Sequence, residues 1–553
     1  MDKKTVLAFA LSFLVLLAWS FLFAPKQEKI PQKEQPHEAK VAQQTTPSEK
    51  APAPGLAPSP VFPETKTAIA AAKVEEKEIH IETPLYSAVF SNVGPSIKSF
   101  KLKKYRETTN PHSPLVDLVS VPKEAGDFLR VNFSSPSAGL APQTVYEADK
   151  VNINLHAGSS PEDLVFQSAT PGGLLSRQTY RFYPDQYNIG LTVDVSDGTE
   201  GAVNGNFNAD LRAFPPAEKK SYYSYVGLAL LLDNKLEEVK LKKASEEKLL
   251  TGQIDWIAYQ DDYFISAVIP AETSKGTFKG RLSPTGLLEG AYVSAPISLK
   301  PSQEASSRFT LYLGPLELSA LKKAGGSLDR AVNFGWTDII AKPLLSLLLF
   351  FDKYTHNYGI AIILLTVLVK ILFWPLTHKS YKSMKEMQKL QPLMAKIREK
   401  YKGDKERMNK EMMGLYKTYK VNPMSGCLPM IIQIPVFFAL YRILGSAIEL
   451  RHAPFVLWIN DLSAPDRLFH FSFAIPFMKP PYGIPVLTLL MGASMFVQQK
   501  MTPTPGDPAQ AKVMMFLPII FTFMFINFPS GLVLYWLVNN LLSIGQQYRI
   551  QKR

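Results

Sequence analysis

The chain has 553 residues, more than one hydrophobic core supports, so we expect two or more domains. Its formal charge of +13 is uneven: residues 25–356 carry 36 basic and 38 acidic side chains, whereas residues 379–420 carry 13 and 5. The only cysteine, Cys427, excludes an intramolecular disulfide framework. Because the basic excess lies between apolar segments, it indicates membrane topology before nucleic-acid binding.

The N-terminal segment predicts a membrane anchor followed by a linker. Residues 6–24 form an apolar run behind Lys3 and Lys4, and about 20 apolar residues span a bilayer. A signal peptide begins in the same way, but residues 21–24 lack the small-x-small cleavage pattern, which favours an uncleaved anchor over residues 1–24. Nine prolines between Pro25 and Pro63 predict a disordered linker over residues 25–74.

Residues 75–326 are predicted to form a large all-β domain. Short runs alternate between apolar and polar residues and are separated by Gly, Pro, Asn and Asp, which is typical of half-buried strands. Their number indicates one large antiparallel sandwich, closed by a short helix over residues 317–324. The alternating runs are 79–81, 88–90, 151–155, 180–182 and 309–313.

The rest of the chain is predicted to be a polytopic α-helical membrane domain. In the segment 327–356 we expect an amphipathic helix over residues 329–353, lying along the membrane interface. A five-helix core over residues 357–548 and a short basic tail, 549–553, follow. With the N-terminal anchor the core makes six transmembrane helices; its apolar segments are 358–376, 427–447, 483–498, 513–528 and 532–545.

Charge orients these spans. Lys3 and Lys4, the loop 379–420 and the C-terminal tail all fall on one side of the membrane. The other side holds the linker, the sandwich and loop 449–482, where three basic and three acidic residues cancel. The positive-inside rule therefore predicts that both termini are cytoplasmic and that the sandwich lies on the opposite side of the membrane.

The sequence gives no support to an enzyme. It contains no phosphate-binding loop, no H-E-x-x-H and no C-x-x-C motif. Ser494, after Gly492 and Ala493, is a candidate intramembrane nucleophile, but no histidine lies within a predicted span to activate it. A close helix contact between small residues explains this run better. We therefore predict no catalytic residue, no metal site and no cofactor.

The basic loop 379–420 is predicted to form a helical hairpin. Apolar residues recur every three or four positions on both sides of Lys402-Gly403-Asp404, as expected for two helices that pack along a seam. The seam explains the methionines, although they also suit an adaptable binding surface. The outward lysines suit anionic lipid headgroups or ribosomal RNA. The hairpin residues we single out are Met387, Met394, Met408, Met412, Lys396 and Arg407.

Lys370 is the main candidate functional residue inside the predicted spans. It lies about 9 Å from the cytoplasmic end of its span, and Thr366 shares its helix face. A lysine so placed can extend to the headgroups, or it can serve in a polar cavity. Gln433 is at similar depth in the next span, which favours the cavity. The remaining polar residues of the spans are Thr522, Asn527, Asn539, Asn540 and Ser543.

Several motifs resemble those of the YidC/Oxa/Alb family of membrane protein insertases, in the Gram-negative form with a periplasmic domain. The resemblance is strongest over residues 330–549 and weaker across the sandwich. The matching stretches are Trp374-Pro375-Leu376-Thr377, Leu390-Gln391-Pro392, residues 421–429, Gln433-Ile434-Pro435, residues 455–463 and residues 528–536.

The resemblance implies an insertase that consumes no ATP. A positively charged hydrophilic groove, open to the cytoplasm and to lipid, would receive the substrate's polar segment, and the substrate's apolar helix would leave along a slide. The implied partners are nascent membrane proteins, the Sec translocon, the ribosome, the receptor of the signal recognition particle and anionic lipids, with no specific nucleic-acid sequence. The implied sandwich is a periplasmic β-supersandwich, and the implied location of the chain is a bacterial inner membrane. The groove residues would be Lys370, Thr366, Gln433, Asn527, Asn540 and Trp536, and the slide residues Ile431, Pro435, Phe438, Met515 and Phe521.

Two departures from the family pattern affect these expectations. The groove charge is usually an arginine, whereas the matching residue here is Lys370, which keeps the charge but loses the planar fork. The chain also ends at Arg553 without a long basic tail, so ribosome contact would rest on the hairpin and the short tail.

Two other functions remain to be tested. One is an ion or solute channel or transporter, for which substrate-independent conductance would speak. The other is a receptor or enzyme in which the sandwich does the work, which an active truncation lacking residues 75–315 would exclude.

Overall fold

The structure is a computed structural model, which describes residues 76–552 apart from positions 123–125, 136–143, 171–172, 198–200, 217–224, 242, 273–274, 420, 422–427 and 502–507. Residues 74–553 form one compact unit. The predicted anchor, residues 1–24, and the predicted linker, residues 25–74, lie outside the described residues.

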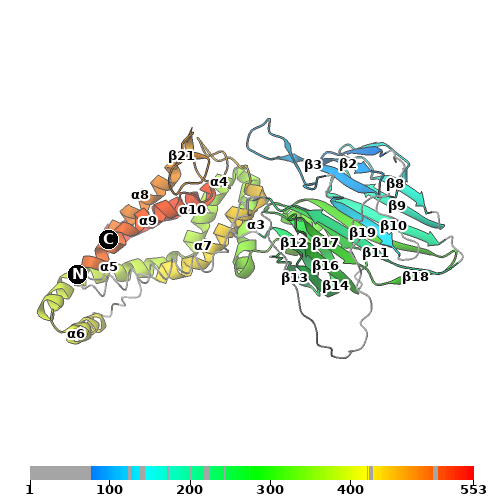
Figure 1. Ribbon diagram of the computed structural model, residues 1–553. Coiled ribbons are helices and arrows are strands. Elements are labelled where there is room, and N and C mark those ends of the chain that lie inside the picture. The colour runs from blue at the N-terminus through cyan, green and yellow to red at the C-terminus, as the bar shows by residue number, and fades with distance from the viewer. Residues whose placement is uncertain are drawn as a thin grey trace, which may run out of the picture. The chain divides into compact units, whose positions relative to one another are not determined.

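The N-terminal half of the described chain is a β-sandwich (Figure 1). A five-stranded sheet has the order β4-β3-β2-β1-β7, and a 14-stranded sheet has the main order β18-β11-β17-β16-β14-β15-β19-β10-β9-β8-β6, with β5, β12 and β13 attached. The strands are β1 (Glu78–Glu82), β2 (Tyr86–Ser91), β3 (Ser96–Arg106), β4 (Leu115–Asp117), β5 (Leu129–Ser134), β6 (Glu147–Ala148), β7 (Asn152–Asn154), β8 (Glu162–Ala169), β9 (Leu174–Phe182), β10 (Asn188–Asp197), β11 (Val203–Ala213), β12 (Gly227–Leu232), β13 (Lys235–Glu238), β14 (Glu247–Gln260), β15 (Phe264–Pro270), β16 (Lys275–Leu282), β17 (Leu288–Val293), β18 (Ile297–Leu299) and β19 (Glu304–Pro315).

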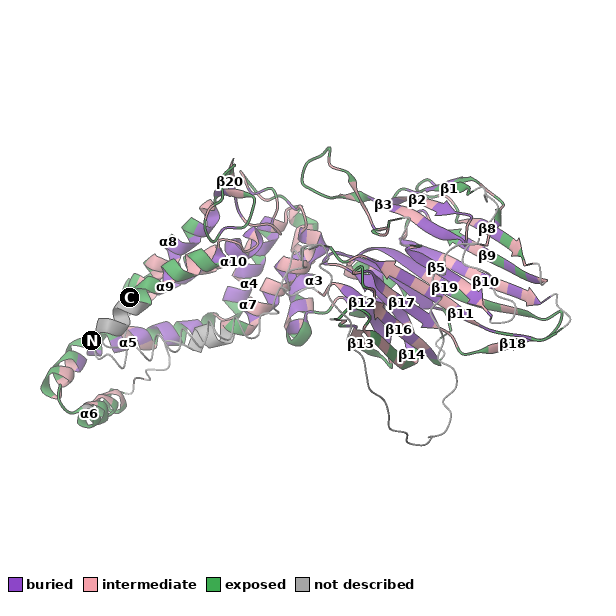
Figure 2. Cartoon of the chain, viewed as in Figure 1, coloured by how far each residue is buried: buried purple, intermediate pink, exposed green. Residues whose placement is uncertain are grey.

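The predicted alternation is visible in these strands. All five alternating runs fall on strands, namely β1, β2, β7, β9 and β19. In β9 every second side chain is buried, so one face of the strand makes the core (Figure 2). The described strand pairs are antiparallel except that β1 pairs with β7 in parallel. Trp256 of β14 is the largest fully buried side chain in this core.

The segment that joins the sandwich to the helical part differs from its prediction. After α2 (Leu318–Ala324) the chain makes two short 3-10 turns, η2 (Leu328–Ala331) and η3 (Gly335–Thr337), before α3 (Asp338–Thr355) begins. The predicted helix start at residue 329 was wrong, because Gly335 takes a left-handed φ of 59° that interrupts any regular helix. A side chain on Gly335 would also overlap the Arg442 guanidinium.

The remaining helices make a second apolar core, separate from that of the sandwich. Its centre contains Leu365, Leu440, Met491 and Phe525. The elements are α4 (Tyr358–Leu372), α5 (Trp374–Lys400), α6 (Lys405–Thr418), α7 (Leu428–Ser446), η5 (Ile448–Leu450), the hairpin β20 (Leu468–Phe471) and β21 (Tyr482–Ile484), α8 (Val486–Met501), α9 (Pro508–Phe525) and α10 (Ser530–Lys552).

Several helix boundaries differ from the predicted ones. The span predicted over residues 358–376 ends at Leu372. The next helix, α5, starts at Trp374 and not at residue 379, and Pro375 occupies its first turn. The span predicted from Gly483 starts at Val486, because residues 482–484 belong to β21. The last helix continues to Lys552, so the predicted tail is largely helical.

Hydropathy alone does not mark these helices as spans. Among the described residues, none of the helices taken singly combines the length and the apolar composition of a transmembrane segment. The pair α4 and α5 meets both criteria together, with a bend of 66° between them.

Candidate functional site: a polar layer in the helical bundle

The site is built on the face of α4 that meets α10. Asn357 caps α4, its Oδ1 accepting a hydrogen bond from the Ile360 amide at 3.1 Å. Ile362, Thr366 and Lys370 follow at intervals of four residues and are all buried, so they line one face of the helix. Lys370 lies in the last turn of α4, closer to the helix end than the sequence predicted.

The Lys370 ammonium points into the bundle rather than out of it. Its Nζ donates a hydrogen bond to Ser543 Oγ at 2.6 Å and contacts Asn539 Oδ1 at 3.4 Å, both on α10. The residue is only 8% exposed. Across the described parts of the chain, no carboxylate lies within ion-pair distance of Nζ. Lys370 is therefore a buried cation held by neutral oxygen atoms.

A row of polar residues on α10 extends this environment. Asn540 donates to Ser494 Oγ of α8 at 3.0 Å, and Gln546 donates to Thr377 Oγ1 of α5 at 3.0 Å. We use "polar layer" for Thr366, Lys370, Thr377, Ser494, Asn539, Asn540, Ser543 and Gln546. Asn539, Asn540, Ser543 and Gln546 recur at helical spacing on α10, and between them they bond to residues of α4, α5 and α8.

Five members of the polar layer were not predicted as site residues: Asn539 and Ser543, which were named only as polar residues of the spans, and Thr377, Ser494 and Gln546. Gln546 follows the predicted end of its span at residue 545, and Thr377 follows the predicted end at residue 376. Ser494 was assigned to a small-residue helix contact, and that contact exists: a side chain on Gly492 would overlap Thr522 Oγ1 of α9. Continuing the 3.6-residue spacing of Asn539 and Ser543 by one turn finds Gln546.

The predicted groove residues do not all meet. Thr366 is buried, but its hydroxyl donates to the Ile362 carbonyl of its own helix at 2.6 Å. Gln433 of α7 donates to the Tyr535 hydroxyl at 3.1 Å, one turn before Asn539 on α10. Trp536 stands in an aromatic cluster instead, with ring centroids 4.8 Å from Phe437 and 4.9 Å from Phe525.

Asn527 belongs to a different part of the bundle. Its side chain donates to the Phe477 carbonyl and accepts from the Lys479 amide, both at 2.8 Å. Arg467 adds to this junction by donating to the Ile526 carbonyl at 2.8 Å and to the Pro481 carbonyl at 2.9 Å. Asn527 therefore fastens the 465–485 segment to the end of α9 and is not part of the polar layer.

The predicted slide residues lie on α7 and α9. Phe438 packs on Trp336 at 5.9 Å, and Phe521 packs on Trp536 at 6.2 Å. Pro435 lies inside α7, whereas the side chain of Ile431 is outside the described residues. Met515 is 46% exposed and belongs to an apolar face of α9 that is open along its length (Figure 2): Met514, Met515, Phe516, Ile519, Ile520, Phe523 and Met524.

The basic segment forms two helices, α5 and α6. Met387 and Met394 are buried on α5, and the Tyr416 hydroxyl of α6 lies 3.9 Å from Met394 Sδ. Met408 and Met412 of α6 are only half-buried, and Lys396 and Arg407 are exposed. The seam thus protects the α5 methionines better than those of α6.

Comparisons with known proteins identify the family. Residues 78–347 match the model described as "YidC periplasmic domain", and residues 350–553 match "60Kd inner membrane protein". Proteins named "Membrane protein insertase YidC" are similar over the whole chain: those of Geobacter metallireducens (42% identical, 98% of its length covered), Pelobacter propionicus (43%, 99%) and Syntrophus aciditrophicus (43%, 100%). The chain belongs to the YidC family of membrane protein insertases.

Solved structures resemble the chain only loosely. An active YidC insertase with its first transmembrane domain resolved matches 86% of this chain and 93% of its own, at 19% identity and a TM-score of 0.37. A galactose mutarotase related enzyme from Lactobacillus acidophilus matches 43% of this chain and 97% of its own, at 11% identity and a TM-score of 0.32. The family assignment rests on the sequence matches alone.

Membership of the YidC family decides several expectations. The protein is a membrane protein insertase of the inner membrane with a periplasmic β-sandwich domain, and its substrates are nascent membrane proteins. Its relatives are named as insertases and not as enzymes, as predicted. The alternative of a channel or transporter finds no support among them.

Proposed function

We propose that the polar layer around Lys370 is the groove through which this insertase receives the polar segment of a substrate. The observation that carries the proposal is the buried Lys370 ammonium, held by Ser543 and Asn539 without a counter-charge in the described residues. A buried charge costs several kcal/mol unless it is compensated, so an uncompensated one inside a bundle marks a functional site.

The chemistry follows from this charge and its polar surroundings. Hydroxyl and amide groups of Thr377, Ser494 and Gln546 offer hydrogen bonds to a substrate's backbone or to water, which lowers the cost of bringing a polar segment to this depth. The Lys370 cation attracts acidic residues in that segment. The drive for insertion then comes from transferring the substrate's apolar helix into lipid.

The exposed apolar face of α9 supports an exit path for that helix. Phe516, Ile519 and Phe523 are each about half exposed, although buried side chains would be expected for a soluble bundle. In a bilayer this face, with Phe521 and the α7 residues Pro435 and Phe438, gives the substrate helix an apolar surface to follow. At the C-terminal end of α9, hydrogen bonds from Arg467 to Ile526 and Asn527 attach the helix to the 465–485 segment.

The membrane arrangement is part of the same proposal. Six spans with both termini in the cytoplasm follow from the distribution of basic residues, with α5 and α6 as a cytoplasmic hairpin and the sandwich outside. Exposed Lys396 and Arg407 are then available to anionic lipids or to a ribosome. The family resemblance adds the Sec translocon and the receptor of the signal recognition particle as expected partners.

The direct test is insertion of a small coat-type substrate into liposomes that contain the purified protein. We expect Lys370→Ala to reduce insertion by at least about tenfold, equivalent to 1.4 kcal/mol of lost interaction. Lys382→Ala is the matched control, because Lys382 is an exposed lysine one helix along, on α5. Near-equal activity of Lys370→Ala and wild type would remove Lys370 from the mechanism and leave only the apolar slide.

A labelling experiment tests the arrangement in the membrane. In a Cys427→Ser background, single cysteines replace Lys402 in the hairpin and Asp255 in the sandwich. A membrane-impermeant thiol reagent applied to intact cells from which the outer membrane has been stripped should label position 255 and spare position 402. The reverse pattern would invert the proposed topology.

A further inference from the structure

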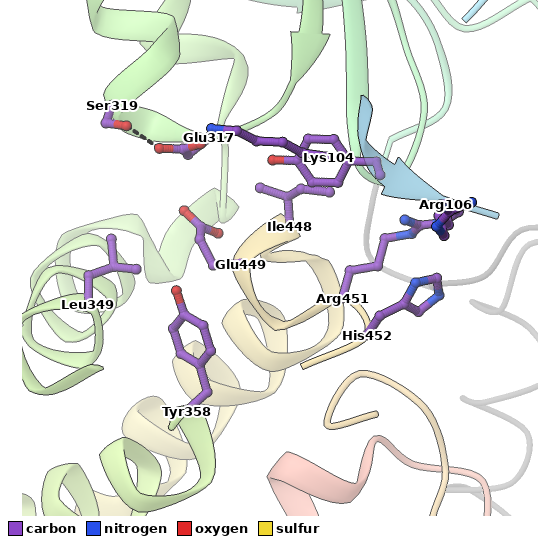
Figure 3. A pocket seen from close by; sticks show the side chains of 11 residues that line it. Lys104, Arg106, Glu317, Ser319, Leu349, Tyr358, Ile448, Glu449, Arg451 and His452 are labelled. Carbon is purple, nitrogen blue, oxygen red and sulfur yellow. Dashed lines mark hydrogen bonds between the residues drawn. The ribbon is translucent and has the colours of Figure 1, made fainter. Parts of the chain in front are cut away.

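A cavity of about 470 Å³ lies between the sandwich and the helical bundle (Figure 3). It is bounded by the end of β3, the start of α2, α3, the start of α4, and η5 with the two residues that follow it. Its size lies within the range of small-molecule sites. Nothing in the insertion mechanism above uses it.

Two carboxylates occupy one side of this cavity. Glu449 points into it beside the Tyr358 hydroxyl, and Glu317 approaches from α2 (Figure 3). In the described residues Glu449 has no ion pair, and the nearby Lys104 extends towards Glu317 without coming within 4.0 Å of it. Burial, and then the charge of Glu317, raises the pKa of Glu449 to about 7, as expected for a carboxylate without a counter-ion.

Basic groups gather on the other side. Arg106, Arg451 and His452 lie together there (Figure 3). The Arg451 guanidinium is held in place by hydrogen bonds to the Arg106 carbonyl at 2.7 Å and the Glu107 carbonyl at 3.3 Å, and it stacks over Phe264 at 5.5 Å. The Arg451 guanidinium is therefore directed away from Glu449, and the negative and positive groups lie on separate sides of the cavity.

The cavity adjoins a helix with a strongly apolar exposed face. On α3, Ile339, Phe350 and Tyr354 are 83%, 53% and 68% exposed, and Trp336 just before it is 64% exposed. Such a face belongs at the headgroup boundary of a bilayer. Leu349 of α3 and Tyr358 line the cavity, so its mouth is at headgroup level if the bundle spans the membrane as proposed above.

We propose that this cavity binds the phosphoethanolamine headgroup of a membrane phospholipid. The ammonium would occupy the Glu449–Glu317 side, and the phosphate would lie against Arg106 and His452. A primary ammonium donates up to three hydrogen bonds, so it compensates the buried Glu449 carboxylate, whereas a trimethylated amine cannot donate any. A headgroup with no cation would leave that carboxylate unpaired.

The test uses the full-length protein, freed of lipid in a non-ionic detergent and titrated with dihexanoyl phospholipids by native mass spectrometry. We expect phosphatidylethanolamine to bind at least about tenfold more tightly than phosphatidylcholine or phosphatidylglycerol, because only the first carries both a donor cation and a phosphate. Glu449→Gln should abolish this preference. Glu304→Gln, at an exposed position at the start of β19, is the matched control and should keep it.

A second variant separates the two ends of the site. Arg106→Gln should weaken all three lipids by a similar factor while the preference for ethanolamine persists, because the phosphate is common to them. Equal binding of the three lipids to wild type, or an unchanged preference in Glu449→Gln, overturns the proposal. Free phosphoethanolamine binding as tightly as the lipid would overturn the membrane as its source. Neither readout depends on insertion activity, so failure here leaves the role of Lys370 standing.

Discussion

The sandwich and the helical bundle both bury charged residues, but they treat them differently. In the sandwich, Arg130 of β5 stands opposite Asp210 of β11 and pairs with Asp127 at 3.3 Å. Arg212 stands opposite Glu289 of β17 in the same way, at 3.4 Å. In the bundle, Lys370 has only neutral oxygen atoms as partners in the described residues. Paired charges fit a structural role, whereas the unpaired one has to be explained by function.

The contrast also concerns exposed apolar surface. The strands of the sandwich expose few large apolar side chains, Leu175 and Leu249 among them, scattered over separate strands. On α9 the exposed apolar residues form one continuous face. Water is therefore a suitable solvent for the sandwich, while the bundle needs lipid or a substrate helix against α9.

The largest effect that sharpens this contrast concerns Arg130. Arg130→Met should lower the free energy of unfolding of the sandwich by about 3–5 kcal/mol, because it removes the main opposing charge from the buried Asp210 and leaves Asp127 with only Lys98, at 3.7 Å. Burial already raises the pKa of Asp210, and Arg130 is the first of the charges that oppose this rise. Urea unfolding followed by near-ultraviolet circular dichroism measures the loss.

Arg181 provides the control for that measurement. It forms an ion pair with Asp163 at 2.7 Å, but on the exposed surface of the sandwich. Arg181→Met should therefore cost less than about 1 kcal/mol. If the two variants lost the same amount, burial would not be what makes the Arg130 pair important.

The next prediction concerns Lys370→Met in the bundle, which should not destabilise the protein as Arg130→Met does. Lys370→Met keeps the length of the side chain and removes a buried charge that has no counter-ion, so the thermal midpoint in detergent should stay unchanged or rise. Insertion should still fall by at least about tenfold. Lys370→Arg, which restores the charge, should recover most of the activity. A large loss of thermal stability in Lys370→Met would mean that the lysine is structural.

The same physical difference explains what the sequence could predict. Strand alternation in runs such as 180–182 and 309–313 depends only on one buried face, so each of the five predicted runs falls on a strand. The bend at Phe373 was missed, because it depends on how Pro375 and the following turn pack and not on hydropathy. With that bend, Thr377 moves from the end of a predicted span into the polar layer.

The candidate site was predictable in part for a similar reason. A lysine inside an apolar segment is visible in the sequence, and so is Thr366 four residues before it. The partners on α10 depend on which helices become neighbours, which local patterns do not encode. Asn527 shows the limit: it lies in an apolar segment like Asn540, yet it binds the 465–485 segment instead.

A smaller effect tests whether the polar layer also stabilises the bundle. Asn540→Ala removes the hydrogen bond to Ser494 and should cost about 0.6 kcal/mol, and no more than about 1.7, as is usual for such bonds between membrane helices. Ser494→Ala and the double variant complete a double-mutant cycle that isolates the pair, with thermal unfolding in detergent as the readout. A coupling energy near zero would mean that both groups bond elsewhere.

A further effect, on the pH dependence of stability, concerns the junction between the two regions, where Glu449 is buried. Its pKa is raised to about 7, mainly by burial and then by Glu317, against 4.5 for the unperturbed group. Between about pH 4.5 and pH 7 the folded protein therefore holds a proton on Glu449 that the unfolded chain has lost. The stability that comes from this proton is complete below about pH 4.5 and is lost as the pH rises through 7. The thermal midpoint of the lipid-free protein should fall from pH 5 to pH 8 for this reason.

Other titratable groups near Glu449 can also contribute to the pH dependence of the thermal midpoint. Across the described residues, the titratable and charged groups that line this cavity are Lys104, Tyr105, Arg106, Glu317, Tyr358, Arg451 and His452, and those that line an adjoining cavity are Tyr225, Glu238, Asp261, Asp262 and Arg442. Glu449→Gln should flatten the decline between pH 5 and pH 8, and Glu317→Gln should shift it to lower pH by removing a neighbouring negative charge. Should Glu449→Gln keep the full wild-type slope, another of these groups would be the one that titrates, and the junction would owe its pH response to it.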